Sequence, residues 1–265
     1  MSAFDPDATL ILVTRPPEEA ALTAKSLAQA GWRALPVPMI ATRPAPMTPA
    51  LKAELDAAQR CPVWIFVSRA AVRAARHLLM SLPSAGIRHV AIGPATGRTL
   101  AEAGVVPDLV LAEGGDSEAL LARGEFAQVG ALRVAIFNAP GGRHEMRDQL
   151  RARGAEVLEV PVYRRVPLPI SAASAARVRA ALPILVMTAT SVEIATRLAH
   201  WLQQEKLDAA WTRPLIVPSA RVAAQARVLG FRDLRVADGA GDKALIRLLM
   251  SSAPGASSDP PRGKG

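Results

Sequence analysis

Short apolar runs alternate with longer amphipathic stretches along most of the chain. The runs are rich in Val, Ile and Leu, which is typical of strands buried on both faces of a parallel sheet. The stretches repeat apolar residues every three or four positions, as helices packed on a sheet do. The predicted strands are Thr9–Thr14, Val63–Ser68, His89–Gly93, Asp108–Ala112, Leu132–Phe137, Ile184–Thr188, Leu215–Pro218 and Leu234–Ala237. The predicted helices include Glu18–Ala30, Ala70–Met80, Thr96–Ala103, Arg143–Arg153, Val192–Gln204 and Ala220–Leu229.

The pattern repeats itself once. Leu27–Gly31 and Pro36–Pro38 reappear as Leu150–Gly154 and Val160–Pro161, with both Gly and Pro displaced by 123 positions. Two further blocks recur in the same order at nearly the same spacing: Val67–Val72 with Met187–Val192, and Leu111–Leu121 with Val236–Ile246. Ordered recurrence of this kind indicates two homologous α/β domains, each with four or five parallel strands.

Two extended segments punctuated by proline, Pro36–Pro46 and Val160–Pro169, occupy matching places in the repeats. Proline excludes both from helices, so we predict a pair of linker strands between the domains. The chain passes between the domains twice, and so needs two linkers, if the N-terminal strand and helix complete the C-terminal domain. The predicted boundaries are 1–37 plus 168–251 for one domain, 41–160 for the other, 36–46 and 160–169 for the linkers, and 252–265 for a disordered tail.

Composition narrows the class of partner. Half of the 265 residues are hydrophobic and the formal net charge is +9, but the longest basic cluster is only Arg164–Arg165. The spread of charge favours a polycarboxylate at least as well as nucleic acid, and an Arg-rich surface without a ligand is the alternative. Cys61 is the single cysteine, which excludes a disulfide within the chain. The N-terminus lacks the basic and then apolar stretch of a signal peptide, and no apolar run reaches the roughly 20 residues of a membrane span. We therefore expect a cytoplasmic protein without membrane or nucleic-acid partners.

Five predicted strand-to-helix turns offer backbone N–H groups that suit carboxylates. The turns are Ser68–Ala71, Gly93–Thr96, Ala139–Arg143, Thr188–Ser191 and Pro218–Arg221. Parallel strands bring such turns to the carboxyl edge of a sheet, where ligands bind, although Ser and Thr there also serve as plain helix caps. The candidate substrate-binding residues are Arg15, Ser68, Thr96, Arg143, Thr188, Ser191, Ser219 and Arg221.

Metal and cofactor motifs are missing from the sequence. His77, His89, His144 and His200 lack metal-ligand spacing, and neither a P-loop nor an HExxH pattern occurs. Gly239–Ala244 has two glycines of a dinucleotide-binding loop, but it lies too near the C-terminus to open a βαβ unit. We therefore expect no metal and no cofactor.

Several segments together resemble a known family. These are Leu12–Pro16, Phe66–Val72, Ala91–Thr96, Gly141–Arg143, Leu150–Val157, Val162–Arg165, Leu229–Phe231 and Asp242–Ile246. In order and spacing, over about residues 8–250, they resemble uroporphyrinogen-III synthases. The resemblance implies two flavodoxin-like or Rossmann-like domains on a two-stranded linker with an active-site cleft between them. It also implies a lyase, here expected to be a monomer, that cyclises the linear octacarboxylate hydroxymethylbilane to uroporphyrinogen III with inversion of ring D and loss of water.

Tyr163, the only tyrosine, follows the second linker's Val160–Pro161. The resemblance places the family's tyrosine here, and a phenol can donate a proton to a departing hydroxyl. The alternative is a half-buried aromatic in a hinge strand.

The second repeat departs from the family pattern, with Pro218 and Arg221 where Gly and Thr stand in the first. That departure motivates a second hypothesis, a non-catalytic tetrapyrrole-binding or regulatory module. A two-domain glycosyltransferase is a third hypothesis, disfavoured by the short chain.

Overall fold

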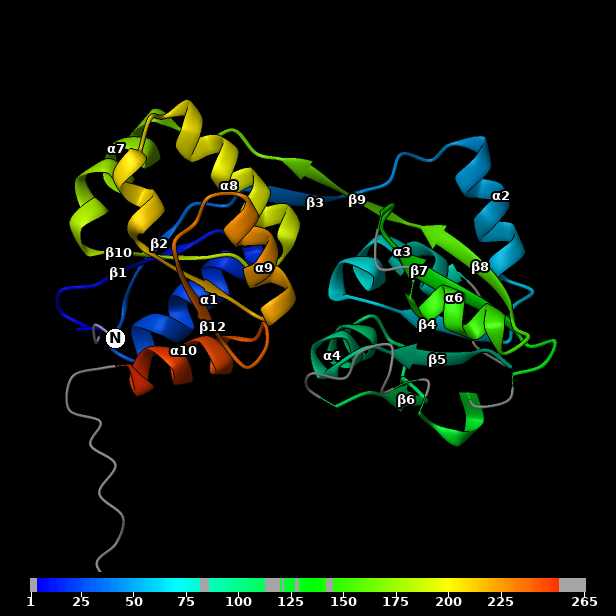
Figure 1. Cartoon of the computed structure of the whole chain (residues 1–265). Coiled ribbons are helices and arrows are strands. Elements are labelled where there is room, and N and C mark those ends of the chain that lie inside the picture. The colour runs from blue at the N-terminus through cyan, green and yellow to red at the C-terminus, as the bar shows by residue number, and fades with distance from the viewer. Residues whose placement is uncertain are drawn as a thin grey trace, which may run out of the picture. The chain divides into compact units, whose positions relative to one another are not determined.

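The protein is described by a computed structural model that covers residues 4–81, 86–112, 120, 122–126, 129–141 and 145–252. The chain forms two compact units. The terminal unit comprises Met1–Ala41 and Pro167–Gly265, and the central unit comprises Thr42–Val166. Each unit has one parallel sheet covered by helices (Figure 1), so the predicted fold class of two parallel-sheet α/β domains is confirmed. Of the predicted tail, 252–265, Ser252 is described and forms the C-cap of the helix Asp242–Ser251, so the tail does not begin there. Residues 253–265 and the candidate Arg143 lie outside the described residues.

The terminal unit has the strand order β12-β11-β10-β1-β2. Its strands are β1 Leu10–Val13, β2 Arg33–Pro36, β10 Leu185–Thr188, β11 Pro214–Val217 and β12 Asp233–Val236. Its helices are α1 Pro17–Gln29, α7 Ala172–Ala181, α8 Val192–Gln204, α9 Ala220–Val228 and α10 Asp242–Ser251. The parallel pairing of β1 with β10 joins the two N-terminal strands, β1 and β2, to three strands from the C-terminal part of the chain.

The central unit has the strand order β6-β5-β4-β7-β8. Its strands are β4 Val63–Phe66, β5 Arg88–Ala91, β6 Leu109–Val110, β7 Arg133–Asn138 and β8 Glu156–Pro161. Its helices are α2 Pro49–Ala58, α3 Arg69–Ser81, α4 Pro94–Glu102 and α6 Glu145–Ala152. Neighbouring strands of this sheet pair in parallel, so the turns that follow β5, β4 and β7 meet at one edge.

The duplication is visible in the order of the elements. β1, β2 and β3 begin at Leu10, Arg33 and Ile40, and β7, β8 and β9 begin 123 positions later in each case, at residues 133, 156 and 163. Matching the repeats in this way turns β12-β11-β10-β1-β2 into β6-β5-β4-β7-β8. Both sheets therefore have the same topology, and the terminal unit takes its β1-α1-β2 portion from the first repeat.

Two paired strands connect the units. β3 (Ile40–Pro44) and β9 (Tyr163–Pro167) form a two-stranded sheet. Backbone hydrogen bonds flank it, from Ala45 to Val162 (2.9 Å) and from Leu168 to Met39 (3.0 Å), and their order shows that the strands are antiparallel. The boundaries between the units fall inside these two strands, whereas the broader segments predicted as linkers also contain the ends of β2 and β8.

Alternating strand residues build a core on each face of each sheet. In β1, Leu12 packs with α7, α8 and α9, while Ile11 and Val13 pack with α1 and α10 on the opposite face. In β4, Trp64 and Phe66 join α2 and α3 in one core, and the intervening Ile65 belongs to the other. This period of two is what continuous apolar runs produce when both faces of a sheet are covered.

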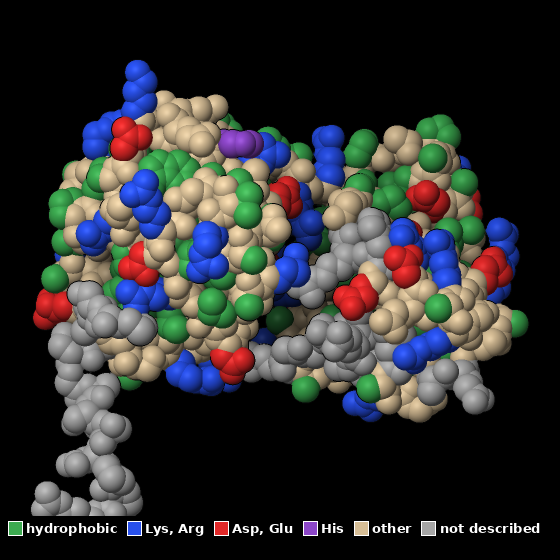
Figure 2. All heavy atoms as spheres, in the orientation of Figure 1, with side chains coloured by type: hydrophobic (Ala, Val, Ile, Leu, Met, Phe, Trp, Pro, Cys, Tyr) green, Lys and Arg blue, Asp and Glu red, His purple; other side chains and the backbone are tan. Residues whose placement is uncertain are grey.

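Two further properties bear on possible partners: the distribution of surface charge, and the length and apolarity of the helices. On the face shown in Figure 2, Lys and Arg side chains are scattered over the surface and do not gather in one patch. Within the described part of the chain, no helix is long and apolar enough to span a membrane.

His89, in β5, is a buried polar residue inside an aromatic cluster. Its ring stacks on Phe66 at a centroid distance of 6.5 Å and an interplanar angle of 17°, and meets Trp64 edge-on at 5.7 Å. Its Nδ1 lies 3.9 Å from a carboxylate oxygen of Asp108. Burial lowers the pKa of His89 below the ordinary value of 6.5, and Asp108 opposes that shift in part.

We expect the stability of the central unit to fall as the pH drops below about 6.5. His89 is kept neutral in the fold but takes up a proton on unfolding, so the unfolded state gains protons as the pH decreases through its pKa. His89→Gln should reduce the slope of unfolding free energy against pH between pH 5 and 7, which urea denaturation at several pH values measures. His200→Gln, on the exposed side of α8, is the control. Equal slopes for His89→Gln and the unmodified protein would exclude His89 as the source.

Candidate functional site

Each sheet has one topological switch point, a pair of neighbouring strands from which the chain continues toward opposite edges of the sheet. In the central unit this point lies between β4 and β7, since β4 leads to β5 and β7 leads to β8. In the terminal unit it lies between β10 and β1. Ligands of open α/β sheets bind beyond the carboxyl ends of the strands at such points. The two switch points therefore locate the candidate site within each unit.

At the central switch point, Ser68 and Tyr163 are brought together. Ser68 follows β4, and Tyr163 begins β9 just beyond the carboxyl end of β8. The Ser68 hydroxyl donates to the Tyr163 phenol oxygen (3.2 Å) and accepts from the Ala71 backbone N–H (3.2 Å). Ser68 thus caps α3 and also orients the phenol, so the two roles considered for it from the sequence coexist.

The Tyr163 ring is buried, with 3% of its surface exposed. It packs in the core that contains Val160, Val162 and Ala71, and the Arg165 guanidinium lies 5.9 Å from its ring centre. The ring therefore stabilises the junction of β9 with the central unit, while its hydroxyl reaches the sheet edge. A single substitution can separate these two contributions, because phenylalanine keeps the ring.

The other candidates of the central unit are held mainly by the backbone. Thr96, in the first turn of α4, is buried, and its hydroxyl donates to the Ile92 carbonyl (3.0 Å). Gly93 precedes α4 with φ +92°, a conformation that favours glycine, and provides no side-chain cap. Donors at this turn are therefore backbone N–H groups.

An ion-paired network not predicted from the sequence lies beside β7. The Asn138 amide donates to Glu159 Oε1 (2.8 Å), and the Arg147 guanidinium pairs with Glu159 Oε2 (2.9 Å). Asn138 occupies the place in its repeat that Arg15 has in the other, 123 positions earlier. The network binds β7, β8 and α6 together, on the side of β7 away from the switch point.

At the terminal switch point, Thr14 and Thr188 are bonded reciprocally across β1 and β10. The Thr14 hydroxyl donates to the Thr188 carbonyl (2.5 Å), and the Thr188 hydroxyl donates to the Leu12 carbonyl (2.8 Å). Both side chains are buried. The candidate Thr188 therefore fixes the two central strands through its hydroxyl, and a ligand at this turn would meet the backbone of the residues that follow.

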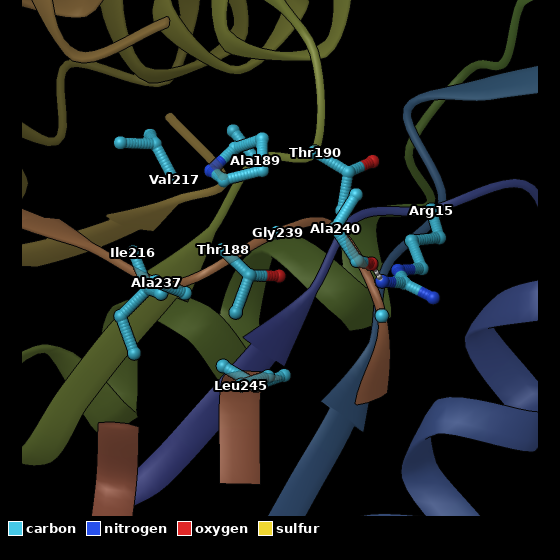
Figure 3. A pocket seen from close by; sticks show the side chains of 12 residues that line it. Arg15, Thr188, Ala189, Thr190, Ile216, Val217, Ala237, Gly239, Ala240 and Leu245 are labelled. Carbon is cyan, nitrogen blue, oxygen red and sulfur yellow. Dashed lines mark hydrogen bonds between the residues drawn. The ribbon is translucent and has the colours of Figure 1, made fainter. Parts of the chain in front are cut away.

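Arg15 is held in a clasp at the start of α10. Its Nη1 pairs with Asp242 Oδ1 (3.0 Å). Its Nη2 donates to the Ala240 carbonyl, and Figure 3 shows this second contact from close by. Two helix α1 hydroxyls also donate to this carboxylate, Thr23 to Oδ1 (2.7 Å) and Ser26 to Oδ2 (3.0 Å). Asp242 therefore joins β1, α1 and α10 at one point.

The pocket in Figure 3 is small. Arg15, Thr188 and Thr190 line it together with residues of β11 and of the loop before α10. Its volume is about 20 Å³, which is room for about one water molecule. It fits a water or a single carboxylate oxygen, and the rest of a large ligand would have to lie outside it.

The remaining candidates sit at helix starts of the terminal unit. Ser191 caps α8 by accepting from the Ile194 N–H (3.2 Å), and Ser219 caps α9 by accepting from the Val222 N–H (3.4 Å). Arg221 is exposed in the first turn of α9. As caps, both serines keep a hydroxyl proton to donate at the carboxyl edge of the sheet.

A family model described as "Uroporphyrinogen-III synthase HemD" matches residues 21–247. The chain belongs to the uroporphyrinogen-III synthase family. Its curated relatives include the Escherichia coli K12 uroporphyrinogen-III synthase, 31% identical over 255 residues that cover 91% of this chain and 99% of the relative. The enzyme of the same name from Salmonella typhimurium LT2 is 34% identical over 143 residues, 51% of this chain and 55% of the relative.

Solved structures of uroporphyrinogen-III synthases share the fold. That of Helicobacter pylori 26695 has a TM-score of 0.58 at 14% identity, covering 92% of this chain and 98% of the other. A mutant of the Thermus thermophilus enzyme has a TM-score of 0.55 at 20% identity, covering 92% and 99%. Membership in the uroporphyrinogen-III synthase family confirms the main functional prediction, an enzyme of tetrapyrrole synthesis with a small-molecule substrate, and does not support the non-catalytic alternative.

For this uroporphyrinogen-III synthase family member, the sequence prediction missed Asp242 as part of the site. From the sequence, Asp242 belongs to a repeated, family-like segment and to a rejected dinucleotide loop, with no role in the site; in the structure Gly241 and Asp242 open α10, and Asp242 pairs with Arg15. An acidic residue just after Gly241 at a helix start was the available signal. Among the described residues, no group of three or more His, Cys, Asp and Glu is placed to hold a metal ion.

Proposed function

We propose that this chain cyclises hydroxymethylbilane to uroporphyrinogen III, inverting ring D and releasing water, and is therefore a lyase. Family membership supports the reaction. The observation that carries the mechanism is the hydrogen bond from Ser68 to the phenol oxygen of Tyr163. Because the phenol accepts this bond, its own O–H proton remains to be donated elsewhere.

In the proposed reaction, Tyr163 acts as the general acid. Its proton passes to the hydroxymethyl oxygen as the C–O bond breaks, and water leaves an azafulvene-type cation behind. The Ser68 hydroxyl stabilises the phenolate that forms. Ring D then attacks through its substituted carbon to give a spiro intermediate, which fragments and recloses. The proton released on reclosure restores the phenol.

The many carboxylates of the substrate are proposed to bind at the helix starts of both units. The N-termini of α3 and α4 in the central unit, and of α8 and α9 in the terminal unit, place N–H groups and the positive ends of helix dipoles at the sheet edges. Ser191, Ser219 and Arg221 add side-chain donors. For Thr96 and Thr188, whose hydroxyls are bonded to carbonyls, the backbone of the turn is the proposed contact. The predicted position of the substrate between the two domains stays a prediction, as does the role of Arg143.

The test is a cyclisation assay on purified protein without added cofactor, with the product isomers resolved chromatographically. We expect mainly the type III isomer. The symmetric type I isomer forms without an enzyme, so a product made only of type I would overturn the proposed function. Detecting type III above the enzyme-free background decides the point.

Ser68→Ala should lower kcat about tenfold, because one hydrogen bond to a developing phenolate is lost. The same substitution made on Tyr163→Phe should have almost no further effect on kcat, since the phenol that Ser68 assists is gone. Thr48→Ala, which removes the α2 cap to Leu51 in the same unit, controls for loss of a helix cap. If the two substitutions reduce kcat independently, Ser68 does not act through Tyr163.

A further inference from the structure

Thr14 is a buried polar residue at the terminal switch point. It follows β1, is fully buried and donates its hydroxyl proton to the Thr188 carbonyl (2.5 Å). Its own backbone carbonyl accepts from the Met39 N–H (3.2 Å), so Thr14 is itself fixed between β1 and the chain that leads into β3. The bond to Thr188 therefore runs from a fixed residue to the end of β10.

The peptide group between Thr188 and Ala189 is held from both sides. Its carbonyl accepts the Thr14 hydroxyl, and its N–H, that of Ala189, donates to the Ile216 carbonyl of β11 (2.9 Å). This peptide leads into the turn before α8, and Thr188, Ala189 and Thr190 line the small pocket of Figure 3. The direction in which the chain leaves β10 thus depends on two hydrogen bonds, one of them from the Thr14 side chain.

The turn before α8 has backbone donors to offer. Within the described part of the chain, the N–H groups of Thr190, Ser191 and Val192 donate to no protein acceptor. They lie at the N-terminus of α8, where they and the helix dipole favour an anion. A carboxylate binds well only if these N–H groups already point to one place, so the orientation of the preceding peptide affects its affinity.

The other repeat shows that the fold does not require this hydroxyl. β1 and β7 begin 123 positions apart, at Leu10 and Arg133, so Thr14 corresponds to Phe137. Phe137 is fully buried and stacks on Phe66 at a centroid distance of 4.7 Å. An apolar side chain therefore fills the same place in a sheet of the same topology, and the hydroxyl of Thr14 has a role particular to the terminal unit.

We propose that Thr14 is a positioning residue, which orients the β10–α8 turn so that its N–H groups bind one carboxylate of the substrate. This inference rests on the proposed function, which takes that turn as a substrate contact. The carboxylate keeps its charge throughout the reaction, so the contact is equally strong in the ground state and the transition state. Loss of the positioning bond therefore raises KM and leaves kcat nearly unchanged.

Steady-state kinetics of Thr14→Val test this role. Valine has nearly the shape of threonine but cannot donate a hydrogen bond. We expect KM for hydroxymethylbilane to rise about five- to tenfold, the effect of weakening one hydrogen bond to a charged group, with kcat changed less than about twofold. Thr14→Ser keeps the donor and should have a KM within about twofold of the unmodified protein. Thr99→Val, which removes another buried hydroxyl, one that donates to the Ala95 carbonyl (3.0 Å), is the matched control and should leave KM unchanged.

The outcomes separate positioning from stability. A merely structural role would reduce the amount of folded enzyme, which lowers the apparent kcat and leaves KM as it is. That result, or an equal rise in KM for Thr14→Ser and Thr14→Val, would overturn the proposal. If the unmodified protein forms no type III isomer, the proposed function fails and this inference fails with it. If it forms the type III isomer and KM is unchanged in Thr14→Val, only this inference fails.

Discussion

Tyr163→Phe should lower kcat for cyclisation about a hundredfold, with little change in KM or thermal stability. Loss of a general acid costs about 10²–10⁴ in rate, and the lower end applies because pyrrole nitrogen electrons help to expel the hydroxyl. Stability is expected to be retained because the buried ring, not the hydroxyl, packs against Val160 and Val162. Steady-state assays over a range of substrate concentrations separate kcat from KM.

The product of the variant adds a second, independent measurement. Residual product should still be mainly the type III isomer, because the orientation of ring D depends on how the substrate is held and not on the acid. A shift to type I in proportion to the loss of rate would mean that Tyr163 orients the substrate. Turnover equal to that of the unmodified protein would remove Tyr163 from the mechanism.

The sequence predicted the buried strands well because their apolar runs are continuous. Val63–Phe66 is buried at every position and stood out as a strand. β2, with the sequence Arg-Ala-Leu-Pro, has only Leu35 buried and lies at the edge of its sheet, so its pattern is too weak to identify. β8 is likewise an edge strand, with two buried positions out of six. Helix α7 was not predicted, because its Ala-rich sequence has no marked apolar face.

Some candidate residues could be located from the sequence because helix capping, a local property, determines where they lie. Ser68, Ser191 and Ser219 follow strands and precede helices, and capping alone places them at the sheet edge. The partner of Ser68 was beyond such rules, because Tyr163 is 95 residues away in the sequence. Contacts of that kind depend on how the linker strand meets the sheet.

The clasp around Arg15 shows the same limit more strongly. Arg15 and Asp242 are 227 positions apart, and the contact exists only because β1 crosses into the sheet built by the second repeat. The sequence places Arg15 after a strand at a ligand-binding edge but does not identify its partner. Without the strand order, an arginine exposed to solvent cannot be distinguished from one that is ion-paired within the fold.

Asp242→Ala should lower the unfolding free energy of the terminal unit by about 2–3 kcal/mol. Removing one partner of a buried ion pair costs about 3–5 kcal/mol, and the estimate is reduced because the Asp242 and Arg15 side chains are 25% and 12% exposed. Part of the loss comes from the Thr23 and Ser26 hydroxyls, which also lose their acceptor. Urea denaturation measures the change through Trp32, which packs in the same core as Leu245 and Leu249 of α10.

Asp238→Ala supplies the matched control for this prediction. Asp238 lies four residues earlier in the chain, and its ion pair with Arg247 (3.6 Å) is formed by side chains that are 93% and 68% exposed. Exposed pairs contribute about 0–1 kcal/mol, so this variant should be nearly neutral. Asp242→Asn keeps the acceptor oxygen and loses the charge, and should fall between the two. A cost for Asp242→Ala no greater than that for Asp238→Ala would show that α10 is held on the terminal unit by its apolar face and not by the ion pair with Arg15.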